Sequence, residues 1–319
     1  MLRSGFLRVL VFSILVISCK NDDEPIPNLD FRQGMREFVQ NISAFAKDQN
    51  NDFLIIPQNG QEILTENSEP TGAIASAYVN AIDGVGREDL FYGYTADNTA
   101  TPAVDRDYLI SICDVAKSNS KVVLTTDYCS TQSKMDDSYT SNQSHGYISF
   151  AADHRELDNI PTYPTTIHNE NTSDVTSLNK VKNFLYLINP NFASKQAYLD
   201  AIKATNYDLV LIDLFFDNVT LTAPDITSLK TKQNGGSRLV ICYMSIGEAE
   251  NYRYYWKGLN KKLVYKENPD WAGNFSVRYW EQAWQDVIYG NNQSYTQKIL
   301  DTGFDGAYLD IIEAYEYFE

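Results

Sequence analysis

Carboxylate side chains stand directly after several apolar runs of this sequence, and their type suggests one kind of chemistry. Asp310 closes the run GAYLD, and Glu248 follows LVICYM in the stretch SIGEAE, next to a permissive glycine. Glycoside hydrolysis needs two carboxyl groups, one as acid and the other as base or nucleophile. Carboxylates held close together in a partly dry site acquire different pKa values, which supplies both states. We therefore predict that Asp310 and Glu248 are the catalytic pair.

Other polar residues follow apolar runs in the same way, and we predict that they position the substrate or tune the pKa of the pair. Helix capping is an alternative reading for Asp213 and Asp127. Glu250 and Arg253 are expected to pair on the surface. The predicted substrate-binding residues are Asp213, Glu88, Asp127, Tyr128, Gln58, Asn59, Tyr243 and Glu313.

Aromatic residues near these positions offer flat faces on which sugar rings can stack, although such residues are more often part of a core. Those we single out are Tyr92, Tyr128, Tyr243, Trp256, Trp271 and Trp280.

Cofactor and metal chemistry find no support in the sequence. The 3 histidines lie in loop-like stretches, no HExxH motif occurs, and the 4 cysteines are too scattered for a zinc ribbon or a disulfide scaffold. Cys242 falls inside an apolar run and reads as a small buried residue. An acidic ring can hold Ca²⁺, but no EF-hand spacing is present. We expect no cofactor.

Eight short apolar runs, separated by helix-like stretches, would position these side chains. Most runs show no alternation, as expected of parallel strands buried on both faces. Eight such strands with helical crossovers predict a (β/α)₈ TIM barrel, whose active site lies at the carboxyl ends of the strands. A doubly wound open sheet is the alternative, but the usual GxGxxG turn is missing. The expected strands are 53–57, part of 84–92, 122–127, 147–150, 184–188, 209–213, 239–244 and 306–310, and the expected helices are 31–49, 61–80, 105–117, 194–205, 223–234 and 279–302.

The order of these elements departs from that of a standard barrel. A helix at 31–49 precedes the first strand, and no helix follows the last one. A circular permutation explains both features, with the helix at 31–49 packing where the last helix would be; a truncated chain is the alternative. Long loops are expected at 93–104, 129–145, 152–180 and 250–275.

Composition limits the classes of protein further. The chain has 319 residues, 43% of them apolar, so it can form a large core. This length fits two average domains or one barrel, and the strand count favours a single domain over 31–319. A formal charge of −16 argues against nucleic-acid binding. We expect a monomer.

The first residues have the pattern of a targeting signal. Residues 1–18 have the positive start and short apolar run of a signal peptide, which ends at Cys19 as in a bacterial lipobox. We expect lipidation of Cys19, a tether over 19–30, and a location at the cell envelope, anchored to the outer membrane and exposed at the cell surface. The acidic stretch 20–24 resembles a surface-export signal of Bacteroidetes lipoproteins.

Several long segments resemble a known family. MREFVQNISAFAK, FLIIPQNG, VGREDLFYG, YDLVLID, VICYMSIGEAENYRYYW, ENPDWAGNFSVRYW and GFDGAYLDIIEAYEY are similar to segments of extracellular glycoside hydrolases related to endo-α-1,4-polygalactosaminidases, glycoside hydrolase family 114. The resemblance implies a TIM barrel that acts on an extracellular polysaccharide containing galactosamine. In these relatives the segment like YDLVLID…GFDGAYLD comes first, which again indicates permutation. The characterised members carry Glu-Pro-Asp where this chain has Tyr308-Leu309-Asp310.

These observations favour a lipid-anchored glycoside hydrolase whose partners are a polysaccharide or oligosaccharide and the membrane. The replacement of an acidic residue by Tyr308 keeps a second hypothesis open, a surface glycan-binding lipoprotein without turnover. A third, a purely structural surface protein, predicts no cluster of carboxylates at the barrel mouth.

Overall fold

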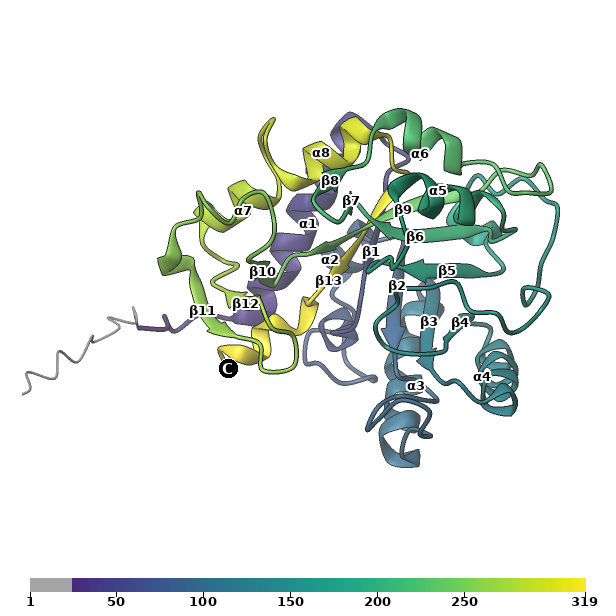
Figure 1. The fold of residues 1–319 in the computed structure, drawn as a ribbon. Helices are drawn as coiled ribbons and strands as arrows, with labels where there is room; N and C mark the ends of the chain where they lie inside the picture. Colours follow the sequence, from purple (N-terminus) through teal and green to yellow (C-terminus); the bar gives the residue numbers. More distant parts are fainter. Residues whose placement is uncertain (1–24) are drawn as a thin grey trace, which may run out of the picture.

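A computed structural model describes residues 25–319, so the expected signal peptide over 1–18 and the expected lipidation site Cys19 lie outside the described residues. The chain has a mixed α/β fold with a parallel central sheet (Figure 1). Eight parallel strands match the eight expected runs. They are β1 (Leu54–Pro57), β2 (Gly84–Glu88), β3 (Val122–Tyr128), β4 (Ile148–Ala152), β5 (Phe184–Leu187), β6 (Leu209–Asp213), β9 (Leu239–Ser245) and β13 (Gly306–Asp310).

The eight strands form two parallel sheets. The larger sheet has the order β1-β13-β9-β6-β5, and the smaller one β2-β3-β4. A parallel bridge between Gln58 and Gly86 joins β1 to β2, and β4 lies beside β5 at the other edge. Among these eight strands, spatial neighbours are therefore consecutive in the sequence, except that the last strand, β13, lies beside the first, β1. All carboxyl ends point the same way, which gathers the residues that follow them.

The strands owe their position to their composition. Every residue of β6 and β9 is buried, and neither strand shows the apolar–polar alternation of a strand with one wet face. Apolar side chains from both faces join one continuous core that runs from Phe31 to Phe318. Cys242 is buried inside β9 as a free thiol, as expected.

The helices that flank the strands agree in part with the sequence. The expected helix 105–117 corresponds to α3, whereas the expected helices 61–80 and 279–302 each divide into two short pieces. The α-helices are α1 (Phe31–Gln49), α2 (Ser76–Ala81), α3 (Ala103–Ser118), α4 (Gln132–His145), α5 (Lys195–Lys203), α6 (Ala223–Leu229), α7 (Gln282–Ile288) and α8 (Tyr295–Thr302), and the 3₁₀ helices are η1 (Gln61–Leu64), η2 (Leu178–Lys180), η3 (Lys261–Leu263) and η4 (Ile312–Tyr317). None of the described helices is both long and apolar enough to cross a membrane.

The helix α1 is capped at its start and packs against two other α-helices. Asp30 caps α1 by accepting a hydrogen bond from the Gln33 backbone N–H at 2.9 Å. The buried face of α1 contacts α2 and α8 (Figure 1). Arg32 at its start forms a bidentate pair with Glu319, at 2.8 and 2.9 Å. The first described residues and the carboxyl terminus are therefore neighbours.

Two segments expected to be loops have regular structure. The stretch 129–145 contains α4, whose polar sequence QSKMDDSYTSNQSH carries little of the apolar periodicity that marks a helix. The stretch 250–275 contributes to an antiparallel sheet beside the strand ends. That sheet has the order β10-β12-β11, from β10 (Glu248–Glu250), β11 (Val264–Glu267) and β12 (Asn274–Val277), and a small hairpin of β7 (Phe215–Phe216) and β8 (Val219–Thr220) follows β6.

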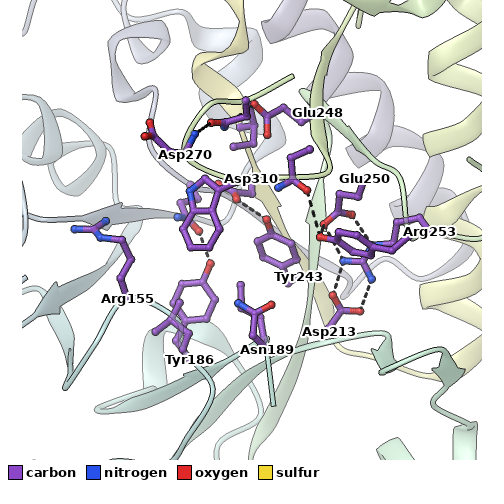
Figure 2. A pocket seen from close by; sticks show the side chains of 18 of the residues that line it. Arg155, Tyr186, Asn189, Asp213, Tyr243, Glu248, Glu250, Arg253, Asp270 and Asp310 are labelled. Carbon is purple, nitrogen blue, oxygen red and sulfur yellow. Dashed lines mark hydrogen bonds and ion pairs between the residues drawn. The ribbon is translucent and has the colours of Figure 1, made fainter. Parts of the chain in front are cut away.

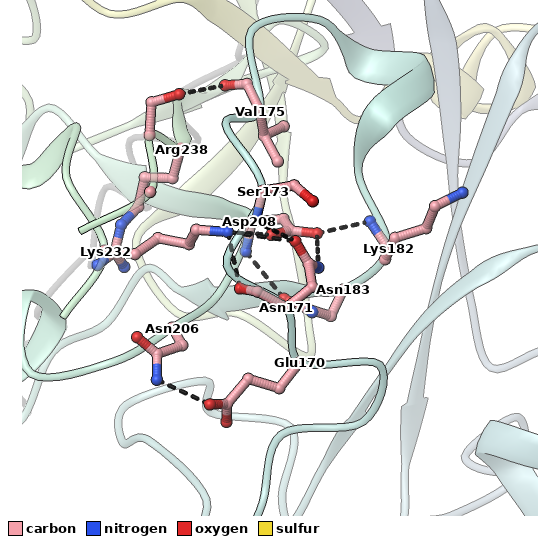
Figure 3. A network of polar contacts seen from close by, with 12 residues as sticks. Glu170, Asn171, Ser173, Val175, Lys182, Asn183, Asn206, Asp208, Lys232 and Arg238 are labelled. Atoms are coloured by element: carbon pink, nitrogen blue, oxygen red, sulfur yellow. Dashed lines mark hydrogen bonds and ion pairs between the residues drawn. The ribbon is translucent and has the colours of Figure 1, made fainter. Parts of the chain in front are cut away.

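At the amino-terminal end of β6, a buried polar network fixes the connection between β4 and β5, which has only η2 in place of a crossover helix (Figure 3). The side chains of Lys232 and Asp208 are fully buried, with Nζ 2.9 Å from Oδ1. The other oxygen of Asp208 accepts from Asn171 and from the Lys182 backbone N–H, each at 2.9 Å. The network replaces the apolar packing that a helix would supply here.

Candidate active site

A cavity of about 640 Å³ lies at the carboxyl ends of the parallel strands. It contains nine of the ten residues that the sequence predicts for catalysis or substrate binding. Figure 2 shows Asp213, Glu250 and Arg253 together on one side of it and Arg155 on the opposite side. The nine predicted residues that line the cavity are Gln58, Asn59, Glu88, Tyr128, Asp213, Tyr243, Glu248, Asp310 and Glu313.

Asp127 is the exception, and its prediction as a substrate-binding residue has to be corrected. Its carboxylate is fully buried and accepts hydrogen bonds from Ser138 at 2.6 Å and Asn142 at 2.9 Å, both on α4. The backbone N–H groups of Phe91 and Tyr92 donate to its other oxygen at 2.8 and 3.1 Å. Successive residues of a strand point to opposite faces, so Tyr128 faces the cavity while Asp127 faces α4.

Asp310 stands at the end of β13 and keeps its proton more readily than a solvated carboxyl does. Its Oδ2 accepts a hydrogen bond from the Tyr243 hydroxyl at 2.6 Å. Burial, followed by the negative charge of Glu88, raises the pKa of Asp310 to about 7, although the Tyr243 hydrogen bond opposes this shift. Asp310 therefore has a proton to give near neutral pH.

The backbone takes up an unusual conformation directly after Asp310. Three neighbouring strands, β1, β2 and β13, are each followed by a residue with positive φ: Asn59 at 58°, Asp89 at 59° and Ile311 at 61°. Asn and Asp tolerate this conformation, but a β-branched residue such as Ile311 does so rarely. Such strain costs on the order of 1–3 kcal/mol and clusters at functional sites. In this chain it turns the backbone sharply just after the carboxylate.

Glu248 reaches the cavity through a close approach of two backbone segments. A side chain at Gly247 would collide with the Ile311 carbonyl oxygen and with Ala314, so glycine is required there. Oε1 of Glu248 accepts from Asn268 and Tyr317, each at 3.0 Å, whereas its buried Oε2 has no hydrogen-bond partner among the described residues. Burial raises the pKa of Glu248, and the two donors oppose this.

Glu88, by contrast, has both of its oxygens occupied. The Tyr128 hydroxyl donates to Oε1, and Asn59 donates to Oε2 at 3.1 Å. The guanidinium of Arg155 stacks over the Tyr128 ring at 4.1 Å and pairs with Asp89 at 2.8 Å. Glu88 is thus held as an acceptor by the protein itself, close enough to Asp310 to raise its pKa.

The carboxylate of Asp213 is likewise engaged by the protein. Arg253 donates to its two oxygens at 2.9 and 2.6 Å, and also pairs with Glu250 at 2.5 Å. The exposed fractions of Arg253 and Glu250 are 8% and 2%, so the expected surface salt bridge is in fact buried. This three-membered ion cluster joins the end of β6 to β10, the strand that carries Glu248.

Glu313 adds a further carboxyl at the start of η4. Its Oε2 is buried and has no hydrogen-bond partner among residues 25–319. Burial and the neighbouring Asp310 raise the pKa of Glu313 to about 8. Glu313 is therefore mostly protonated at neutral pH and presents a neutral hydrogen-bond donor.

Tyr308, which replaces an acidic residue of the resembling family, does not line the cavity. It is fully buried, packs against Tyr186 with ring centroids 5.5 Å apart, and its hydroxyl lies against Gly86. A Cβ at Gly86 would occupy the position of that hydroxyl, so the glycine makes room for the tyrosine.

The aromatic residues singled out from the sequence divide into two groups. Tyr128, Tyr243 and Trp271 line the cavity. The others do not: Tyr92 donates to Asp137 at 2.7 Å, Trp256 stacks on Phe275 at 5.0 Å, and Trp280 packs on Phe31 at 4.9 Å.

The cavity is strongly acidic. Its lining contains eight carboxyl groups and two guanidinium groups, and both guanidinium groups are already paired with carboxylates. The positively charged or neutral parts of a ligand are therefore favoured there. No group of three or more His, Cys, Asp or Glu side chains in the part of the chain described could hold a metal ion.

Sequence reasoning missed several residues of the cavity because they lie on irregular segments without periodicity. Tyr252, Asn268 and Asp270 nevertheless fall inside the long segments that resemble family 114, so that resemblance carried a signal for them. Arg155 and Asn189 fall outside those segments, and no signal marks them.

Comparison with known families gives a match for the second half of the chain. Residues 168–319 match the model of glycoside-hydrolase family GH114. This part of the chain is GH114-like. It includes Asp213, Glu248 and Asp310, whereas Gln58 and Glu88 precede it.

Curated relatives of this GH114-like chain are themselves described as uncharacterized proteins. One from Methanocaldococcus jannaschii is 34% identical over 179 residues, which cover 54% of this chain and 49% of the relative. One from Deinococcus radiodurans is 35% identical over 125 residues, covering 38% of each chain. The chain thus spans about half the length, or less, of the curated relatives it matches.

Among solved structures, the crystal structure of Aspergillus fumigatus Ega3 in complex with galactosamine is similar at 21% identity. The alignment covers 46% of this chain and 51% of that one, with a TM-score of 0.33.

Proposed function

We propose that this protein is a glycoside hydrolase that cleaves an extracellular polysaccharide with Asp310 and Glu248 as its catalytic carboxyl groups. One observation carries the assignment. The protein itself engages both oxygens of Glu88 and of Asp213, whereas Glu248 and Glu313 each retain a buried oxygen without a partner among the described residues; of these two, Glu313 is mostly protonated, which leaves Glu248 as the base or nucleophile. A carboxylate that acts on a substrate needs such an oxygen. The GH114-like match over residues 168–319 supports the reaction class.

The two carboxyl groups take different roles in this proposal. Asp310 is the general acid, because its pKa of about 7 leaves it protonated near neutral pH. Glu248 is the base or nucleophile, because Asn268 and Tyr317 donate hydrogen bonds that stabilise its charged form. Asp213, Glu88 and Glu313 shape the field around them, Asn59 and Tyr128 hold Glu88, and Tyr243 holds Asp310. Gln58, whose Oε1 accepts from Tyr186 at 2.8 Å, contacts the substrate.

The substrate we propose is a polysaccharide that contains unacetylated hexosamine, such as galactosamine. A protonated amino group on the sugar gains from the acidic lining, and both arginines of the cavity are committed to carboxylates. A polyanionic glycan would be repelled by the same lining. The galactosamine bound to Ega3 belongs to that protein, and it suggests the first compounds to try.

We further propose that the eight strands close into a (β/α)₈ barrel in circularly permuted order. The Gln58–Gly86 bridge and the adjacency of β4 and β5 support closure. The packing of α1 between α2 and α8 supports the permutation. A family model with the segments in the other order would match one part of the chain, as the match over 168–319 does.

Lipidation at Cys19 and attachment to the outer membrane at the cell surface remain part of the proposal. The start of α1 contacts η4, and Glu313 and Tyr317 of η4 line the cavity. A tether at this end would therefore leave the protein near the cavity mouth.

A screen of amino-sugar polymers with mass analysis of the products tests the function. Purified protein is incubated with polygalactosamine, with chitosan and with their N-acetylated forms as controls. We expect oligosaccharides from an unacetylated polymer, and none from the Asp310→Asn variant. Binding of a polymer without any product after prolonged incubation would instead support the non-catalytic glycan-binding protein, and neither binding nor product would contradict both.

A further inference from the structure

Three exposed aromatic side chains line the cavity, and one of them, Tyr317, donates its hydroxyl to Glu248. Trp271 and Tyr252 have exposed fractions of 44% and 55%, and both line the cavity. Large aromatic groups left in water at the edge of a cavity mark a binding surface, because their burial by a ligand is favourable. The Tyr252 hydroxyl donates to Oε1 of Glu250 at 2.6 Å, which anchors this ring at the wall of the cavity.

The segment that carries Trp271 is held rigidly. Asn268 begins it with a hydrogen bond from its backbone N–H to the Asn274 carbonyl at 2.8 Å, and its side chain accepts from the Asp270 N–H at 3.0 Å. The Asn274 N–H donates to the Trp271 carbonyl at 3.1 Å, and the Gly273 N–H donates to Glu267 at 3.0 Å. A ring presented by so many fixed contacts loses little conformational entropy on binding.

The same segment also holds a proposed catalytic residue. The side-chain amide of Asn268 donates to Oε1 of Glu248 at 3.0 Å while its oxygen fixes the turn at Asp270. Asn268 therefore connects the exposed Trp271 turn directly to Glu248. Figure 2 shows Asp270, Glu248 and Asp310 on one side of the cavity, away from the Arg253 cluster.

We propose that Trp271, with Tyr252 and Asp270, forms an outer sugar subsite, and that its occupation sets the position of Glu248 through Asn268. The proposal rests on the glycoside hydrolase function above. Its occupant is a second amino-sugar unit of the same polysaccharide. The apolar face of the ring covers the indole, and the ammonium group lies beside the Asp270 carboxylate, which no hydrogen bond or ion pair engages within residues 25–319.

This arrangement predicts that the length of the substrate oligosaccharide affects both KM and kcat. A substrate long enough to reach Trp271 binds more tightly, which lowers KM. Contact with Trp271 also shifts this rigid turn as a unit, so that the Asn268 amide brings Glu248 into its reactive position, which raises kcat. If Trp271 contributed only binding affinity, the length of the substrate would change KM alone.

Calorimetry on the inactive Asp310→Asn protein measures the subsite without turnover. We expect galactosamine or glucosamine oligomers of four or more units to bind about tenfold more tightly than disaccharides, and Trp271→Ala to remove that gain. Trp271→Phe should restore part of it. Tyr94→Ala, which removes a ring with an exposed fraction of 47% outside the cavity, is the matched control and should bind as the parent does.

Kinetics with Asn268→Ala then test the coupling. We expect kcat to lose its increase with chain length while oligomer affinity changes less than threefold. Equal affinity for all lengths, with no effect of Trp271→Ala, would overturn the subsite but leave the hydrolase standing. Unchanged length dependence of kcat in Asn268→Ala would overturn the coupling. Failure of the Asp310→Asn protein to bind any oligomer would contradict the proposed function itself.

Discussion

The hydroxyl of Tyr243 on β9 lies 2.6 Å from Oδ2 of Asp310 on β13, so the neighbouring strand supplies a donor to the central carboxyl of the cavity. This hydrogen bond acts against burial and Glu88, which raise the pKa of Asp310 to about 7. The proton affinity of the proposed acid is therefore set by packing within the parallel sheet.

Tyr243→Phe tests this relationship. Removing a donor to the charged form raises the pKa of Asp310 further. If Asp310 is the general acid, activity falls as pH rises through its pKa, so the variant should keep activity to higher pH than the parent. The pH dependence of kcat/KM measures the shift. An alkaline limb at the same pH in both proteins would exclude this role for Tyr243.

The cavity should also make the folded state less stable at high pH. The pKa values of Asp310 and Glu313 are raised to about 7 and about 8 in the folded protein, above their unfolded values. Their stabilising protonation is complete below about pH 4 and is lost as pH rises to about 8. One pKa unit corresponds to about 1.4 kcal/mol, so each of the two groups loses on the order of a few kcal/mol of its contribution to the free energy of unfolding.

The Glu313→Gln variant has no titrating group at position 313, so its stability should depend less on pH than that of the parent. We expect its Tm to exceed that of the parent at pH 9 and to approach it at pH 5, measured by calorimetry in matched buffers. The same difference at both pH values would show that Glu313 titrates normally.

Arg253→Met should destabilise the folded protein at the wall of the cavity that Asp213 and Glu250 form. Two buried carboxylates would lose their shared cation, and breaking such a cluster typically costs about 3–5 kcal/mol. Chemical denaturation measures the loss. Lys203→Met removes an exposed partner of Asp200 and should leave the denaturation midpoint nearly unchanged. Equal losses in the two variants would mean that the buried cluster contributes no more than a surface pair.

Asp127→Ala should affect stability rather than substrate binding. Four donors, from Ser138, Asn142 and two backbone N–H groups, would lose their buried acceptor, at a cost of at least about 2 kcal/mol. We expect a lower denaturation midpoint with KM nearly unchanged at a temperature where the variant is folded. A stable Asp127→Ala variant with a raised KM would show that Asp127 does take part in substrate binding.

The sequence predicts most of the fold because buried parallel strands leave a clear signal. Runs such as LVLID and GAYLD have no other plausible place than the core, and their ends identify Asp213 and Asp310. The polar sequence of α4 carries no such signal, because its few buried residues suffice to pack it against β4.

The candidate site was predictable only where strands end. Asp127 and Tyr128 are adjacent, and only the direction of the pleat, set by the register with β2 and β4, decides which one faces the cavity. The pairing of Arg253 with Asp213 joins residues 40 positions apart. The position of Trp271 depends on an antiparallel sheet that the sequence pattern does not reveal.

The most direct test of the central claim is the rate of product formation from the unacetylated polymer by Asp310→Asn, Glu248→Gln and Glu88→Gln, each confirmed as folded. We predict that the first two lose at least about a thousandfold in kcat, since each removes a reacting group. We predict that Glu88→Gln retains measurable turnover with a lowered pKa of Asp310. Parental rates in both Asp310→Asn and Glu248→Gln would contradict the assignment.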